Sequence, residues 1–209
     1  MNAPRFSPEE PTGSEAASLP PAYFEAMYAE NPDPWDFETS AYEAAKYAAT
    51  LEALPRPTYA NAFEIGCSIG VLTKWLAARC ERLLSVDVSE HALARAKARC
   101  HDLSHVRFEQ RRIPADFPDE TFDLILVSEV GYYWSLPDLE KARAGFEESL
   151  TQGGHLLLVH WTPFVDDYPL TGDAVHEAFL NASRRRGAPL RPLYARREDR
   201  YRLDLFERR

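Results

Sequence analysis

Short apolar runs alternate with segments of helical spacing along most of this chain, and this alternation is what most constrains its fold. The strands expected at 122–130 (FDLILVSEV) and 152–161 (QGGHLLLVHW) each contain a continuous apolar run, as in strands buried on both faces. Shorter runs predict further strands at 60–65, 82–88, 105–110 and 201–208. Buried strands separated by helices form a mostly parallel α/β sheet whose ligands bind beyond the carboxyl ends of the strands.

Capping residues and helical spacing predict the elements between the strands. Ser40 is placed to cap a helix over 41–54, and Ser89 to cap one over 90–100. An aromatic helix precedes them, with Tyr23, Met27 and Tyr28 on one face. Further helices are expected at 69–79, 137–150 and 171–186.

We expect one domain over 22–209, preceded by a flexible leader over 1–21 that is rich in Pro, Ser and Glu. Within the domain, 22–60 would form a helical cap or lid and 61–161 the cofactor-binding core. Residues 162–209 would supply a substrate-side loop, a helix and the C-terminal strands.

Charge and cysteine usage exclude several classes of protein. The net charge is −9, from 24 basic and 33 acidic residues, which disfavours non-specific nucleic-acid binding. No apolar run approaches the ~20 residues that span a bilayer, and the N-terminus has no apolar signal segment, so we expect a cytoplasmic protein. Three cysteines without a C-x-x-C pair predict buried free thiols and no metal site.

The stretch Phe63–Gly70 (FEIGCSIG) allows two interpretations. Gly66 to Gly70 fits G-x-S-x-G, the turn that carries a nucleophilic serine in hydrolases, here Ser68. That fold needs strands and an oxyanion loop before the serine, whereas two helices are predicted there. The order of elements therefore favours the other interpretation, a glycine turn where a cofactor lies against bare backbone.

An acidic residue at the end of the next strand strengthens the cofactor interpretation. Asp87 is placed to accept hydrogen bonds from both hydroxyls of a ribose. Glu64 lies one residue before the end of the first strand, and Gly66 and Gly70 permit close backbone approach. The spacing lacks the third glycine of a dinucleotide site, and S-adenosylmethionine needs no phosphate cradle.

The stretches FEIGCSIGVLT, LLSVDVS, RIPADFPDETFDLILVSEV and LTQGGHLLLVH resemble the motifs of the class I S-adenosylmethionine-dependent methyltransferases. That resemblance implies a Rossmann-like, mostly parallel seven-stranded sheet with helices on both faces and an antiparallel last strand. Two flanking stretches are similar to nodulation protein S (NodS) and its bacterial relatives, a family implied to N-methylate a deacetylated amino sugar at the end of a chitin-type oligosaccharide. The flanks that carry this second resemblance are DPWDFETSAYEAAKY and VHWTPFVDDYPLTGDAVHEAF.

The resemblance implies a cofactor shell drawn from the lid and from the strand ends. Lid aromatics would close over the cofactor, a lysine would pair with its carboxylate, and the glycine turn would frame its methionine end. Asp87 would hold the ribose, and the segment after the third strand would pack the adenine. The implied shell is Trp35, Tyr42, Lys46, Glu64, Gly66, Cys67, Ser68, Gly70, Asp87, Val88, Arg112, Ile113 and Glu129.

Two strand ends supply candidates for proton transfer. Glu129 would face the sulfonium, either as a base or as a carboxylate with no proton role. His160 ends the fifth strand at the same rim, where its ordinary pKa suits a base, and His176 is a weaker candidate. Substrate contacts are expected from Tyr132, Tyr133 and Trp161.

The function predicted from the sequence is methyl transfer from S-adenosylmethionine to a small-molecule amine, with an amino sugar or a deacetylated chitooligosaccharide as the acceptor. An O-methyltransferase, a serine hydrolase using Ser68 and a non-catalytic nucleotide-binding protein remain open. We expect a small-molecule or oligosaccharide partner, no nucleic acid, no membrane span, and a monomer or weak homodimer.

Overall fold

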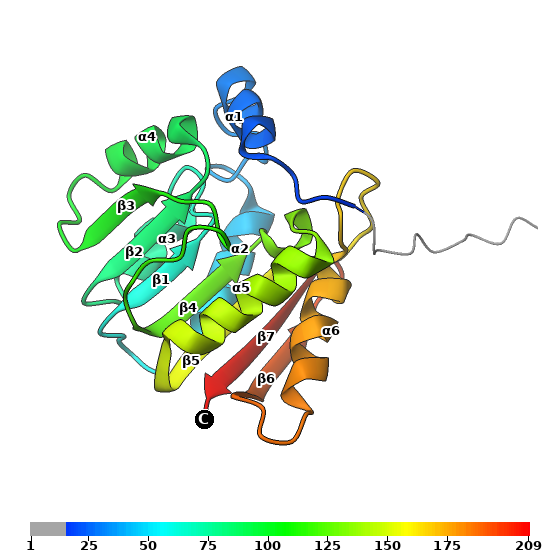
Figure 1. The fold of residues 1–209 in the computed structure, drawn as a ribbon. Coiled ribbons are helices and arrows are strands. Elements are labelled where there is room, and N and C mark those ends of the chain that lie inside the picture. Colours follow the sequence, from blue (N-terminus) through cyan, green and yellow to red (C-terminus); the bar gives the residue numbers. More distant parts are fainter. Residues whose placement is uncertain (1–15) are drawn as a thin grey trace, which may run out of the picture.

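A single twisted sheet organises the residues that the computed structural model describes, 16–209 (Figure 1). Its strand order is β3-β2-β1-β4-β5-β7-β6, in which β7 runs antiparallel to both of its neighbours and the other strand pairs are parallel. This order confirms the Rossmann-like sheet with an antiparallel last strand. The strands are β1 (Ala62–Ile65), β2 (Leu83–Asp87), β3 (Val106–Gln110), β4 (Phe122–Ser128), β5 (Leu150–Trp161), β6 (Leu190–Arg197) and β7 (Tyr201–Arg208).

The helices begin where the sequence places polar caps. Ser40, Ser89, Ser135 and Thr171 each accept a hydrogen bond from a backbone N–H in the first turn of the helix that follows. The helical elements are α1 (Pro21–Glu30), α2 (Ala41–Glu52), α3 (Val71–Ala77), α4 (Glu90–Arg99), the 3₁₀ turn η1 (Gly131–Tyr133), α5 (Leu136–Ser149) and α6 (Gly172–Ser183).

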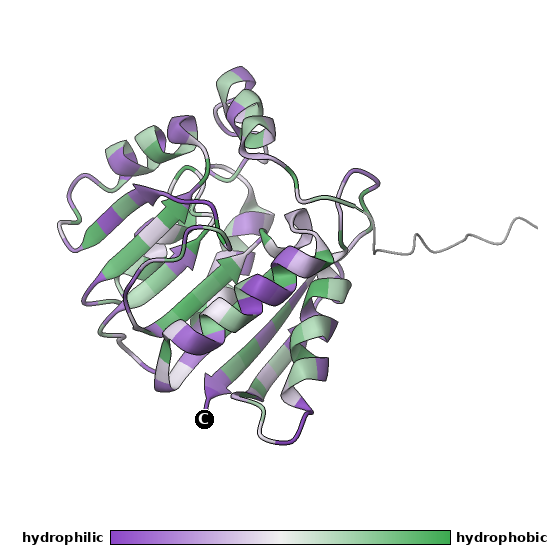
Figure 2. Ribbon diagram, in the orientation of Figure 1, coloured by the Kyte–Doolittle hydropathy of each residue, from purple (hydrophilic) through white to green (hydrophobic). Residues whose placement is uncertain are grey.

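Each face of the sheet is covered by its own apolar cluster. On one face Phe63 stacks on Phe122 with ring centroids 4.8 Å apart, and α5 and α6 pack there through residues such as Phe146 and Phe179. On the other face α2 and α3 pack on alternate residues of the same strands. The central strands are accordingly hydrophobic along most of their length, whereas α4 and α5 alternate hydrophobic and hydrophilic residues (Figure 2).

Three elements differ from expectation. The helix after β1 starts at Val71 rather than residue 69, because Gly70 adopts a left-handed conformation and serves as its N-cap. A 3₁₀ turn that the sequence pattern did not suggest follows β4. The edge strand β6 was not predicted, because it is largely exposed and therefore lacks the apolar pattern of a buried strand. It also contains Pro192, where its pairing with β7 is irregular.

The proposed leader falls mainly on residues 1–15, which lie outside the described residues. Its last part is bonded to the domain. The Leu19 N–H donates to Tyr133 O, and the Ser18 hydroxyl donates to Asp138 Oδ2 over 2.6 Å. Within the described residues, no helix is long and apolar enough to cross a membrane.

Replacing Gly70 by alanine should destabilise the fold more than the same change at Gly187. Both glycines have a φ near +78°, which costs roughly 1–2 kcal/mol for an L-residue. A Cβ at Gly70 would also lie 2.9 Å from Ala96 Cα, adding about 1–3 kcal/mol, whereas one at Gly187 meets nothing within 4 Å. Urea unfolding of both variants measures the difference, and equal losses would contradict the close approach of α3 and α4.

Candidate functional site

A cavity of about 520 Å³ opens at the carboxyl ends of β1, β2 and β4, where the strand order reverses. The helices α1 and α2 and the segment between them contribute to its walls. It brings together all the residues that the sequence singled out for the site except Gly70, His160 and His176. Those that line it are Trp35, Tyr42, Lys46, Glu64, Gly66, Cys67, Ser68, Asp87, Val88, Arg112, Ile113, Glu129, Tyr132, Tyr133 and Trp161.

The turn after β1 presents bare backbone to this cavity. Gly66 has a φ of 76°, and a Cβ there would lie 2.1 Å from Val130 Cγ2. Ser68 also adopts a positive φ, which turns its N–H toward Asp87. Gly70 does not line the cavity. It lets α4 approach, so its role is to support the turn.

Backbone amides hold the Asp87 carboxylate. Oδ2 accepts the Ser68 N–H over 2.9 Å, and Oδ1 accepts the Ser89 N–H over 3.0 Å. Burial raises the pKa of this group, and the two amide hydrogen bonds oppose that shift. Each oxygen keeps a lone pair for a further donor. The site can therefore accept two hydroxyl hydrogens from one ligand.

Glu64 is buried beneath the same turn. Its Oε2 accepts the hydroxyls of Thr73 and Ser85, each over 2.7 Å. Burial raises its pKa to about 7, because the two hydroxyl bonds only partly compensate for lost hydration. The side chain therefore changes charge close to neutral pH.

A buried ammonium joins the lid to the end of β4. Lys46 Nζ, from α2, lies 2.6 Å from Glu129 Oε1 and 2.9 Å from Glu43 Oε2. Burial alone would lower the pKa of Lys46, but the attraction of Glu129 and Glu43 outweighs it and raises the pKa. One cation with two carboxylates gives this cluster a formal charge of −1.

Glu129 is held at both oxygens. Oε1 accepts from Lys46, whereas Oε2 accepts the Tyr132 hydroxyl over 2.5 Å and the Trp161 N–H over 2.9 Å. Its φ of 58° is rare for a non-glycine residue and turns the chain sharply at the end of β4. Three of the roughly four lone-pair sites of the carboxylate are used, so at most one is left for a ligand.

His160 is not in contact with the cavity. It is fully buried, its Nε2 accepts the Gly131 N–H over 3.0 Å, and its Nδ1 lies 3.1 Å from His176 Nε2. Burial holds the pKa of His160 well below its ordinary value. The geometry therefore does not support the expectation that His160 or His176 serves as a base that touches the acceptor.

Ser68 lacks the partner that a nucleophilic serine requires. Its Oγ accepts the Tyr28 hydroxyl over 2.5 Å, a contact that joins α1 to the glycine turn. All six histidines lie within residues 16–209, and each has its hydrogen-bond partners elsewhere. The arrangement of a hydrolase is therefore missing from this part of the chain.

Other residues line the cavity without having been identified from the sequence. Tyr168, from the loop after β5, stacks on Tyr132 with ring centroids 5.0 Å apart. The sequence did not indicate this contact, because the two residues are far apart along the chain. Arg200, in the β6–β7 connection, lies over the Tyr42 and Trp161 rings at 5.8 and 6.0 Å. Glu43 could have been identified, since it falls one turn before Lys46 on a predicted helix.

A comparison with protein families identifies the group to which this chain is related. The family model for nodulation protein S (NodS) matches residues 27–152, more than half of the sequence. The chain belongs to the NodS family. The match includes α2, the glycine turn, β4 and α5, and therefore most of the cavity.

Individual relatives agree with this family. Nodulation protein S of Bradyrhizobium diazoefficiens is 42% identical over 102 residues, 48% of this chain and 49% of that protein. The N-methyltransferase NodS of Bradyrhizobium japonicum WM9, solved with S-adenosyl-L-homocysteine, is 26% identical with a TM-score of 0.77 and covers 90% of this chain and 97% of its own. A Pseudomonas syringae protein, solved as a candidate methyltransferase, is 36% identical with a TM-score of 0.70, covering 81% and 100%. The chain aligns with about half the length of the curated nodulation protein S sequences it matches.

Removing the ionisable group at Glu64 should change how stability depends on pH. Between pH 4.5 and 7 the folded chain keeps a proton on Glu64 that the unfolded chain releases, so this group costs stability as the pH rises through that interval. The free energy of unfolding of Glu64→Gln, relative to that of the wild type, should therefore rise by about 2–3 kcal/mol from pH 5 to pH 8. Urea unfolding at both pH values measures this, and parallel pH profiles would contradict it.

Proposed function

We propose that this protein transfers a methyl group from S-adenosylmethionine to the nitrogen of a small-molecule amine. The observation that carries the proposal is the Asp87 carboxylate, held by two amides beside the bare backbone of Gly66 in the main cavity of a NodS-family chain. The relative crystallised with S-adenosyl-L-homocysteine, the demethylated product, supports the same cofactor here.

The residues present fit this cofactor. Its ribose offers two hydroxyl donors, and Asp87 has one remaining acceptor site on each oxygen. We propose that the methionine end lies along Gly66, which lines the cavity with backbone alone and whose replacement by a larger residue would push against Val130. A cavity of about 520 Å³ is within the ordinary range for such ligands. We propose that Val88, Arg112 and Ile113 pack the adenine, since they line the same cavity.

When bound, the cofactor supplies a methyl group on an activated sulfonium. The protein then has to align the amine with that methyl group, which can contribute roughly 7–11 kcal/mol. The amine must also have lost its extra proton by the time its nitrogen attacks. The cluster of Glu43, Lys46 and Glu129 carries a formal charge of −1, which favours a cationic ligand beside it. We propose that the free lone pair on Glu129 accepts a hydrogen bond from the acceptor amine.

The acceptor would lie against aromatic side chains on the other side of Glu129. Tyr132, Trp161 and Tyr168 line this part of the cavity, and aromatic rings pack well against sugar faces and cations. An amino sugar, such as the deacetylated end of a chitooligosaccharide, combines the amine and the ring that these residues suit. Cytoplasmic location and a monomeric or weakly dimeric state remain predictions from the sequence.

Thermal unfolding with and without S-adenosylhomocysteine tests the cofactor. Ligand at 100 times its dissociation constant should stabilise the fold by about 2.7 kcal/mol, which raises the midpoint by roughly 5–10 °C at 2–4 °C per kcal/mol. Asp87→Ala should abolish the shift. Ser68→Ala should keep it, because the Ser68 contact with Asp87 is through the backbone. A folded wild type without a shift at millimolar ligand would refute the cofactor assignment.

Transfer of a labelled methyl group to glucosamine oligomers tests the acceptor. We expect labelling of fully deacetylated oligomers and at least tenfold less of N-acetylated ones, since an amide nitrogen is a poor nucleophile and lacks the charge that the cluster attracts. Mass spectrometry of the monosaccharides released by acid hydrolysis locates the label, and label on a hydroxyl oxygen rather than on nitrogen would favour the O-methyltransferase alternative. Labelling of both oligomers alike would contradict recognition of the amine.

A further inference from the structure

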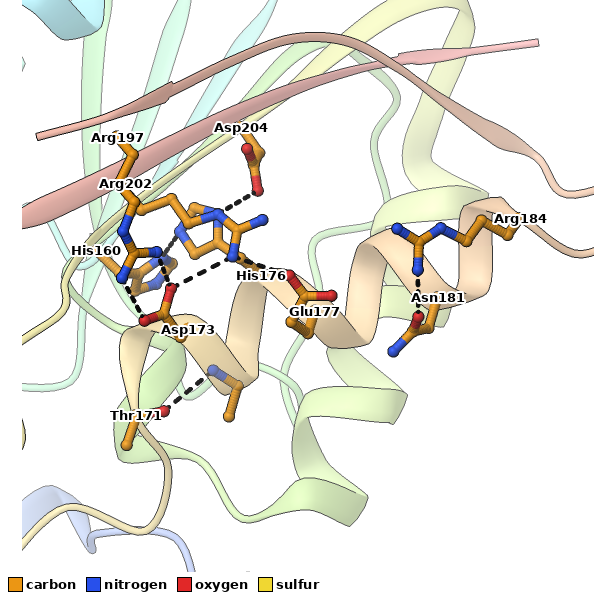
Figure 3. A network of polar contacts seen from close by, with 11 residues as sticks. His160, Thr171, Asp173, His176, Glu177, Asn181, Arg184, Arg197, Arg202 and Asp204 are labelled. Atoms are coloured by element: carbon orange, nitrogen blue, oxygen red, sulfur yellow. Dashed lines mark hydrogen bonds and ion pairs between the residues drawn. The ribbon is translucent and has the colours of Figure 1, made fainter.

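A buried row of polar side chains links β5, α6 and β7 (Figure 3). His160 on β5 is hydrogen-bonded to His176 on α6, and His176 Nδ1 lies 2.7 Å from Asp204 Oδ2 on β7. All three residues are at most 1% exposed. We call His160, His176 and Asp204 the histidine chain.

The direction of every hydrogen bond in the histidine chain follows from one backbone group. The Gly131 N–H can only donate, so His160 Nε2 must accept. A neutral His160 then carries its proton on Nδ1 and donates to His176 Nε2. His176 in turn carries its proton on Nδ1 and donates to the Asp204 carboxylate.

The outer end of the histidine chain is fixed by an arginine. Arg202 Nε lies 3.0 Å from the same Asp204 Oδ2 that accepts from His176. The Arg202 guanidinium also pairs with Asp173 and Glu177 on α6. Asp204 is therefore oriented from both sides, and the proton of His176 has one available acceptor.

The inner end of the histidine chain is the sharp turn after β4. Glu129 has its left-handed φ there, and its N–H donates to Val159 O on β5. The Trp161 N–H of the same strand donates back to Glu129 Oε2. The bond from Gly131 to His160 is thus the third point at which the end of β5 holds this turn.

The turn after β4 is packed closely against α6 and β5, so a side chain at Gly131 would not fit. A Cβ at Gly131 would lie 2.7 Å from Val175 Cγ1 and 2.8 Å from His160 Nε2. A Cβ built on Gly172 would lie 2.1 Å from the Trp161 carbonyl oxygen. The helix α6 therefore presses the histidine chain directly against η1, which carries Tyr132 and Tyr133.

We propose that the histidine chain is a positioning device: it keeps His160 in the tautomer that accepts the Gly131 N–H, and so sets Glu129 and Tyr132 toward the acceptor amine. This inference rests on the proposed methyl transfer. It assigns no proton-transfer step to either histidine. The residues act through Gly131, and their removal should affect the acceptor side of the cavity more than the cofactor side, where Asp87 is held by other groups.

Kinetics of four variants test the positioning role. His160→Leu and Asp204→Leu should lower kcat for the amine by about 10–100-fold, since small misplacement of reacting groups has effects of that size. Their dissociation constants for S-adenosylhomocysteine should stay within about threefold of the wild type. Asp204→Asn should recover most of the rate, because its amide oxygen still accepts the hydrogen bond from His176.

His155→Leu is the matched control. His155 is also a buried histidine on β5, but its Nδ1 bonds to the Tyr59 hydroxyl over 2.8 Å and it does not line the cavity. It should lose stability with kcat near the wild-type value. Equal rates for folded His160→Leu and wild type, or equal rate losses in Asp204→Asn and Asp204→Leu, would overturn the proposal.

Nuclear magnetic resonance of the wild-type protein tests the inference independently of activity. Nitrogen shifts should place the proton on Nδ1 of both His160 and His176, and the Gly131 amide should exchange slowly with solvent. A proton on His160 Nε2 would overturn the inference even if methyl transfer is observed. If methyl transfer is absent but the Nδ1 protons and slow exchange are found, the proposed function fails while the hydrogen-bond directions stand.

Discussion

The buried ammonium of Lys46 is the contact on which the rest of the site depends. It lies on α2, outside the sheet, and pairs with Glu129 at the end of β4 and with Glu43 on its own helix. Removing one partner of such a buried group costs about 3–5 kcal/mol, because the remaining charge has no water around it. The pairing therefore fixes where the helical cap meets the strand ends, and with it the width of the cavity.

Two kinds of backbone constraint work together at the strand ends. At the end of β1, Gly66 provides a surface without a side chain, and Ser68 turns its amide to Asp87. At the end of β4, Glu129 adopts a left-handed conformation that three bonds from β5 stabilise. The first constraint suits a ligand that lies along the backbone, and the second projects a carboxylate into the space beside it.

The parts of the fold that sequence could predict are those with a repeating physical signal. Buried strands read as continuous apolar runs, and helices start at Ser40, Ser89 and Thr171 because these side chains cap the first turn. The edge strand β6 gave no such signal, because an exposed strand needs no apolar face. The residues lining the cavity were mostly predictable from strand ends, since parallel strands bring their carboxyl ends to one edge. The sequence could not predict whether the His160 side chain points into the cavity or away from it. Its orientation depends on contacts with α6 and β7, which lie further along the chain.

The place of β7 in the sheet has a consequence for how the protein is made. β7 lies between β5 and β6 and supplies Asp204, yet it follows every other strand along the chain. During synthesis, β5 emerges from the ribosome with one edge unpaired and the polar groups of His160 and His176 unsatisfied. Exposed strand edges promote association with other chains. The arrival of β7 therefore both covers the free edge of β5 and supplies the carboxylate that completes the histidine chain.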